Sequence, residues 1–185
     1  MDIRKYAYAT VAIIIEDISS VPLRSFGDEY LGVEEWFVMM NEFLIYDLYI
    51  CDRFLFSQWG NDLREKLMKE IMPLISRHVE KAREEVLNKQ FKNLSLENLP
   101  HYFKTLRATS TGEWIITSLN QKQREYSQYK LIKEYPKAGS WDGLLEWEFV
   151  KGLAALLKRE KRQPFILALW TQAMGILPKL ARVPA

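Results

Sequence analysis

Cysteine and histidine are scarce in this sequence. Its 185 residues contain one cysteine, Cys51, and two histidines, His78 and His101. A single cysteine excludes an intrachain disulfide and a zinc site built from several thiolates. Cys51 lies in an apolar segment, which indicates a small buried core residue. Neither histidine has a glutamate three residues before it, the spacing that di-iron helical bundles need, so we expect no such metal site.

Long uninterrupted apolar runs are also missing. A bilayer-spanning helix needs about 20 consecutive apolar residues, and Glu42 and Asp47 interrupt the best candidate. The first residues, MDIRKYAYATVAIIIEDISS, have the basic start and short apolar stretch of a signal peptide, but Glu16 and Asp17 stand where its cleavage site should be. We therefore expect no membrane span, and a cytoplasmic location.

Charge of either sign is not in excess. Lysine and arginine together number 26 against 24 acidic residues, a formal net charge of +2. That balance excludes bulk electrostatic affinity for nucleic acid, so any basic site must be local. With 48% apolar and 27% charged residues, the composition is that of a folded globular protein. The length predicts a single domain over residues 1–185.

Catalytic and nucleotide-binding motifs are missing as well. The sequence has no Gly-x-Ser-x-Gly nucleophile elbow, and its eight glycines do not form a phosphate-binding loop. Nucleophilic catalysis also needs a base and an orienting group beside the nucleophile, and a buried Cys51 does not supply that arrangement. We expect no cofactor, and enzymatic activity has no positive support.

The apolar residues that are present recur with the period of an α-helix. About seven segments show it, and no hairpin signal occurs, so the sequence predicts an all-α fold, an irregular multi-helix bundle. The first segment is ambiguous because residues 10–15 are rich in β-branched side chains that suit a strand. A helical stripe favours a helix there; it is formed by Ile3, Ala7, Val11, Ile14 and Ile18.

Glycine, proline and capping residues mark the predicted helix ends. A long central helix is expected over residues 33–58, ended by Gly60. An amphipathic helix follows, which Pro73 should kink or break. Ser110 and Glu113 fit a capping box that opens another helix. Ser140 can cap a later one.

On a helical wheel the central helix is apolar around most of its circumference. One arc contains Trp36, Met40, Phe43, Ile50 and Phe54, and a narrow polar edge expected to face water contains Glu34, Asn41 and Asp52. The third, mixed stripe contains Glu35, Met39, Glu42, Tyr46, Tyr49 and Arg53. Asp47 falls inside the apolar arc and is the anomaly.

An unpaired carboxylate among apolar side chains is costly, so Asp47 needs a partner for its charge, a raised pKa or a water-filled pocket. Arg53 lies too far around the helix to pair with it, and the possible partners from elsewhere are Arg107, Arg124 and His78. The favoured interpretation is a buried polar anchor that fixes helix packing. The alternative is a ligand-binding, metal-binding or hydrolytic pocket around Asp47, with candidate residues Glu42, Tyr46, Asp47 and Arg53. A carboxylate-only magnesium or calcium site could use Glu35, Glu42, Asp47 or Asp52.

A second alternative site is basic. Lysines and arginine interleave with Tyr126 and Tyr129, a pattern that suits phosphate contact with base stacking. The candidate nucleic-acid-binding residues are Lys122, Arg124, Lys130 and Lys133.

The favoured function is that of a non-catalytic interaction or regulatory domain. Six tryptophans are many for this length, and residues 164–177 form a segment that is apolar around most of its circumference. Such a helix must be buried between neighbours or cover a partner. We therefore predict a protein partner or self-association as a homodimer.

Overall fold

The computed structural model describes residues 1–20, 32–90, 104, 109–127 and 143–184, and the elements in this part of the chain are helices. They are α1 (Ile3–Ser20), α2 (Val33–Gln90), α4 (Thr111–Glu125), α5 (Leu144–Leu156), α6 (Gln163–Ala173) and α7 (Ile176–Leu180). The predicted all-α fold is confirmed. None of the described helices is long and apolar enough to cross a bilayer.

The ambiguous first segment is a helix. In α1 the side chains of Ala7, Val11, Ile14 and Ile18 are buried, at the spacing the helical stripe required. The β-branched residues are accommodated because one side of the helix packs along α2, where bulky side chains fill the core.

Helix α2 is bent into two arms at Gly60. Its backbone angles there, φ 73° and ψ −176°, are non-helical and lie in a region that is essentially restricted to glycine. The predicted central helix is the first arm, and its predicted end at Gly60 is confirmed. The second arm runs on to Gln90 with Leu67, Ile71 and Ile75 fully buried.

Pro73 does not break the second arm, so the break that was one of its two expected effects is absent. Helical backbone angles continue through it. Proline removes one amide donor and leaves the carbonyl four residues earlier without its helical partner. Pro73 is exposed, so water can hydrate that carbonyl.

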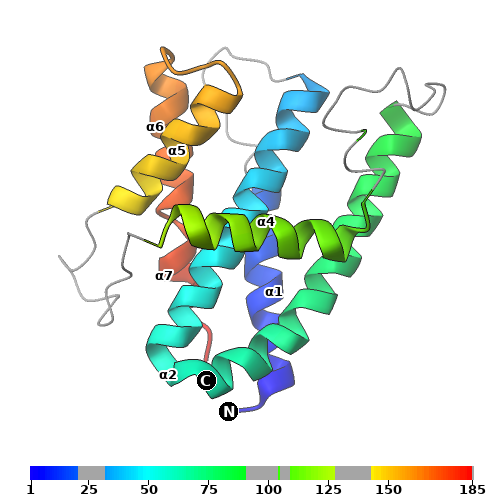
Figure 1. The fold of residues 1–185 in the computed structure, drawn as a ribbon, viewed down its shortest axis with the longest axis vertical. Coiled ribbons are helices and arrows are strands. Elements are labelled where there is room, and N and C mark those ends of the chain that lie inside the picture. Colours follow the sequence, from blue (N-terminus) through cyan, green and yellow to red (C-terminus); the bar gives the residue numbers. More distant parts are fainter. Residues whose placement is uncertain (21–31, 91–103, 105–108, 128–142, 185) are drawn as a thin grey trace.

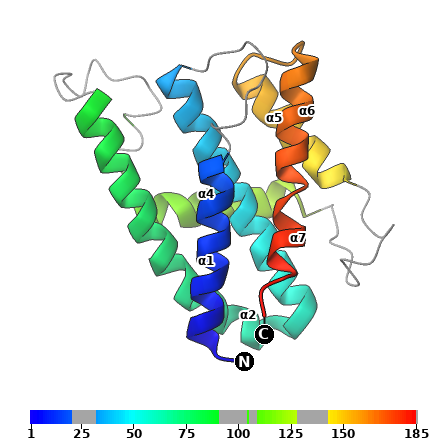
Figure 2. The ribbon, with the colours of Figure 1, turned by 180° about the vertical axis from the view of Figure 1, so that it is seen from behind.

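The helices form layers around the first arm of α2. Figures 1 and 2 show the two arms diverging from the bend, with α1 against one side and α4 crossing the other. Helices α5, α6 and α7 lie beside the first arm, and α7 contacts both α1 and α2. The first arm is therefore central, as predicted. Its fully buried side chains include Met39, Phe43, Tyr46, Asp47, Leu48, Ile50 and Cys51.

The capping residues explain where α4 and α5 begin. The Glu113 amide donates to the Ser110 hydroxyl at 3.3 Å, so the predicted cap of α4 is confirmed. The N-cap of α5 is Gly143 in a left-handed conformation; Ser140, the predicted cap, lies outside the described residues. The Trp170 ring lies so close to Gly143 that a side chain at this position would contact it.

Candidate functional site

Asp47 is buried on the first arm of α2 without a partner. Its side chain has no exposed surface, and neither carboxyl oxygen has a hydrogen-bond partner in the described structure. Burial raises the pKa of Asp47 well above its ordinary value of 3.8. The Asp17 carboxylate raises this pKa further, and the Lys179 ammonium lowers it. Burial therefore favours the protonated, neutral form of the Asp47 carboxyl.

The ionic centre of this region is Asp17, which the sequence analysis did not single out. It is fully buried in α1 and forms an ion pair with Lys179 of α7. The Gln172 amide of α6 donates to its other oxygen at 2.6 Å. Asp17 thus ties three helices together. Its position three residues after Ile14, on the buried stripe, is the signal that could have found it.

The expected partners of Asp47 do not reach it. Both Arg124 and His78 are exposed, on α4 and on the second arm of α2, and Arg107 lies outside the described residues. The expectation that Arg124 or His78 pairs with Asp47 is wrong. Burial instead favours the neutral form of Asp47, which does not need a cation as partner.

Tyr46 is fully buried and joins α5 to the first arm. Its ring stacks on Phe149, with centroids 4.2 Å apart and planes at 14°. Burial raises the pKa of Tyr46 well above its ordinary range, and the neighbouring carboxyl groups of Glu146 and Asp47 add to this effect. The phenol is therefore neutral and positioned for packing.

Glu42 and Lys122, predicted for two different sites, contact each other. The Lys122 ammonium lies 3.1 Å from a Glu42 oxygen and 3.6 Å from an oxygen of Glu125. It also lies 5.4 Å from the centre of the Tyr126 ring. Burial acts to lower the pKa of Lys122, but Glu42, Tyr126 and Glu125 outweigh it and the pKa is raised overall. Lys122 is thus a charged anchor between α4 and α2.

Of the remaining basic candidates, Arg124 alone lies among the described residues. Arg124 is exposed, and its guanidinium donates to the Asn120 carbonyl at 3.4 Å. Lys130 and Lys133 lie outside the described residues. The segment 120–125 forms the last part of helix α4.

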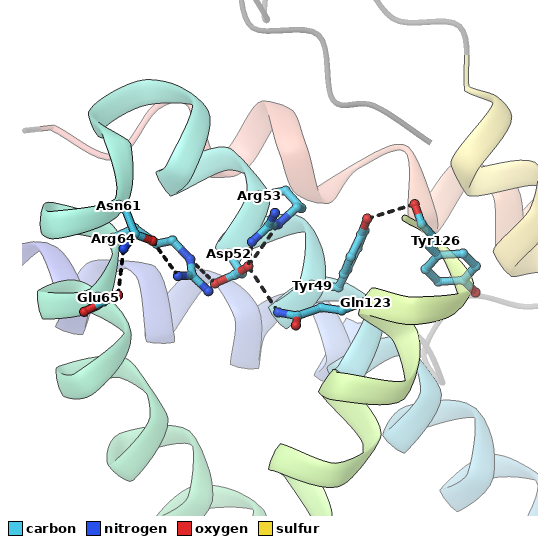
Figure 3. Close-up of polar contacts among 8 residues, drawn as sticks. All are labelled: Tyr49, Asp52, Arg53, Asn61, Arg64, Glu65, Gln123 and Tyr126. Carbon is cyan, nitrogen blue, oxygen red and sulfur yellow. Dashed lines mark hydrogen bonds and ion pairs between the residues drawn. The ribbon is translucent and has the colours of Figure 1, made fainter. Parts of the chain in front are cut away.

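Asp52 is the centre of a second polar network, shown in Figure 3. Arg53 donates to one of its oxygens at 3.0 Å through Nε, and Arg64 donates to the other at 2.6 Å. Gln123 of α4 approaches the first oxygen at 3.4 Å. Because Arg64 follows the bend, the network connects both arms of α2 with α4. Asp52 is thus the partner of Arg53, which the helical wheel did not identify.

The predicted polar edge of the central helix does not face water at the residues that can be described. Asp52 and Asn41 are only 1% and 5% exposed, so that expectation is wrong for both. Asn41 donates from Nδ2 to the Phe37 carbonyl at 2.7 Å, a bond within the helix. A helical wheel describes one helix alone, so it could not show that the second arm and α4 cover this edge.

Two hollows lie near these residues. One of about 400 Å³ is lined by the Glu42 and Lys122 side chains, with Glu125 and Glu148. The other, of about 320 Å³, lies between the end of α1 and the two arms of α2. Asp47 lines neither of them. Within the described ranges no three acidic, histidine or cysteine side chains are grouped as a metal site would require.

Comparison with known proteins gives no relative: no family model, no curated protein and no solved structure matches this chain.

Proposed function

We propose that this chain is a non-catalytic interaction domain that pairs with a second copy of itself through α5 and α6. The observation that carries this proposal is a group of large apolar side chains that these helices leave exposed. Leu144, Trp147 and Leu167 are 48%, 39% and 59% exposed. Together with the half-buried Trp170 they are called here the α5–α6 apolar face.

The members of this face are connected. The Trp147 and Trp170 rings meet edge to face, with centroids 6.2 Å apart, so the two helices share one aromatic surface. Leu144 and Trp147 are three residues apart on α5, as are Leu167 and Trp170 on α6, so each pair lies on one side of its helix. Tryptophan is the residue type most enriched at the energetic centre of protein interfaces.

A second copy is the favoured occupant because little repulsion opposes it. The net charge of +2 is small, so two copies repel each other weakly. A face on one side of the molecule can meet itself across a two-fold axis, the commonest symmetry of soluble oligomers. The sequence also carries none of the catalytic motifs sought above, which favours an interaction role.

The test compares two variants that place a glutamate on an exposed apolar residue. Leu167→Glu puts a charge on the face and is expected to give monomers by sedimentation velocity. Tyr8→Glu is the control, because Tyr8 is 62% exposed on α1, away from α5 and α6. It should sediment as the unmodified dimer. Equal sedimentation of both variants would contradict the proposed interface.

A further inference from the structure

We propose that the hollow between α1 and the arms of α2 binds a neutral medium-chain alcohol, an apolar chain that ends in one uncharged hydroxyl. This inference is independent of self-association, because the hollow lies on different helices from the α5–α6 apolar face. Three features of the described lining point to this ligand: an apolar wall, one buried amide and a rim whose opposite charges offset each other.

The wall of the hollow is made largely of hydrocarbon. It is formed chiefly by Ile18, Phe37, Met40, Leu44 and Val79. Pockets for small molecules have volumes of about 300–1,000 Å³ and mostly apolar linings with a few polar groups. A dry apolar cavity of about 150 Å³ accommodates benzene, and at the same volume per heavy atom 1-octanol needs about 225 Å³. The hollow, at about 320 Å³, therefore has room for an eight-carbon chain and its hydroxyl.

Asn41 places a polar group in this wall. Its side chain is 5% exposed and lines the hollow. One N–H bond of its amide is used by the Phe37 carbonyl at 2.7 Å, which leaves one N–H donor and the carbonyl oxygen without a partner among the described residues. A hydroxyl both donates and accepts, so it can satisfy either group, whereas a carboxylate only accepts and an ammonium only donates. Because an unpaired buried polar group is costly, the amide favours a ligand with a hydroxyl.

The charges of the described lining favour a neutral ligand over an ion. Lys81 and Glu85 are exposed at the rim, one helical turn apart, and their opposite charges offset each other. Arg83 is buried in the lining but is already engaged, because it donates to the Thr111 hydroxyl at 2.7 Å and to the Thr109 carbonyl at 3.4 Å. A charged head group would lose its water here without gaining an opposite charge, and a hydroxyl loses much less.

Isothermal titration calorimetry tests the site with three probes of equal chain length: 1-octanol, octanoate and octylammonium. The titrations are made at pH 8, where histidines such as His78 of the rim are uncharged, with each probe below the concentration at which it aggregates. We expect saturable binding of one octanol per chain and at least tenfold weaker binding of both ions. Absence of octanol binding, or less than a tenfold preference over either ion, would overturn the proposal.

The contact between Asn41 and the hydroxyl is tested with a matched ether. Heptyl methyl ether has as many heavy atoms as 1-octanol but cannot donate a hydrogen bond. In Asn41→Leu the amide is replaced by an apolar group of similar size, so the ratio of octanol affinity to ether affinity should fall several-fold from its wild-type value. An unchanged ratio in the folded variant would overturn the assignment of Asn41 as the polar contact.

A filling variant locates the bound chain whether or not Asn41→Leu folds. Ala82→Trp puts a large ring at an exposed position of the lining and should weaken octanol binding at least tenfold. Ala12→Trp is the matched control, because Ala12 is exposed on α1 and does not line the hollow; it should leave the affinity unchanged. Wild-type affinity in Ala82→Trp, or an equal loss in both variants, would place octanol elsewhere and overturn the proposal.

Discussion

At the residue scale, the first arm of α2 buries two aspartates in opposite ways. Asp52 is an acceptor for two arginines, whereas Asp47, five residues earlier, has no hydrogen-bond partner in the described structure. A buried carboxyl either finds cations or takes up a proton. The contribution of Asp47 to stability should therefore depend on pH.

Asp47→Asn should make the protein more stable at alkaline pH. The folded-state pKa of Asp47 is raised, so its contribution to stability is complete below its unfolded value near 3.8. That contribution is lost as the pH rises toward the raised value, by about 1.4 kcal/mol per pH unit. Asparagine is neutral throughout and avoids this loss. Thermal denaturation over a pH series that begins near pH 5 should show the advantage of the variant growing with pH until the raised pKa is passed.

Asp17→Asn is the matched control for that experiment. It removes the charge that Lys179 and Gln172 contact, so it should lower the melting temperature at neutral pH. If Asp47→Asn were also destabilising at pH 8, Asp47 would have to be ionised and paired, contrary to our account.

Asp52→Asn should destabilise the fold by about 1–3 kcal/mol. The substitution weakens two charge-assisted hydrogen bonds, and the figure is kept modest because Arg53 and Arg64 are 34% and 21% exposed. Urea denaturation measures the change. Glu65→Gln, at an exposed acid bonded to Asn61, should change stability by less than about 0.5 kcal/mol. Similar small effects of both substitutions would show that the network is not needed for the bend.

The sequence could identify Asp47 as anomalous, because its apolar surroundings follow from the helical period alone. It could not identify Asp17 or Lys179 as the charges that act on it, since they come from α1 and α7. Nor could it show that Glu42 would bind Lys122. Partners on different helices depend on tertiary packing, which no local pattern encodes.

At the element scale, the bend in α2 decides the arrangement of the other helices. The change of direction at Gly60 turns the chain back so that the two arms diverge from the bend, with α1 against one side of the first arm and α4 crossing the other. This turn was predictable from glycine, as were the cap at Ser110 and the helical stripe of α1. The continuation of the helix through Pro73 was not predictable, because it depends on which side of the helix is exposed.

Gly60→Ala should cost about 1–3 kcal/mol, because alanine is strained at φ 73° and ψ −176°. A side-chain clash is not the reason, since nothing lies within 4 Å of a Cβ built there. Gly152→Ala is the matched control. It has equally open surroundings within α5, and alanine there should stabilise by about 0.5–1 kcal/mol. Guanidinium denaturation of both variants distinguishes the backbone effect: equal changes of the same sign would contradict it.

At the scale of the whole molecule, α1, α6 and α7 are joined through polar contacts to the buried Asp17, while α5 and α6 present apolar side chains to the outside. The first feature holds the bundle together, and the second provides the surface that we propose for self-association. The sequence indicated that residues 164–177 would be buried or cover a partner. Only the structure shows that Phe165 and Leu169 are buried whereas Leu167 is exposed.

The central claim, self-association, is tested most directly by the mass of the unmodified chain in solution. Light scattering should be measured over a dilution series that begins at micromolar concentration. We predict a mass near twice the chain's 21.9 kDa that falls toward that value on dilution. A mass of 21.9 kDa at every concentration would contradict the account.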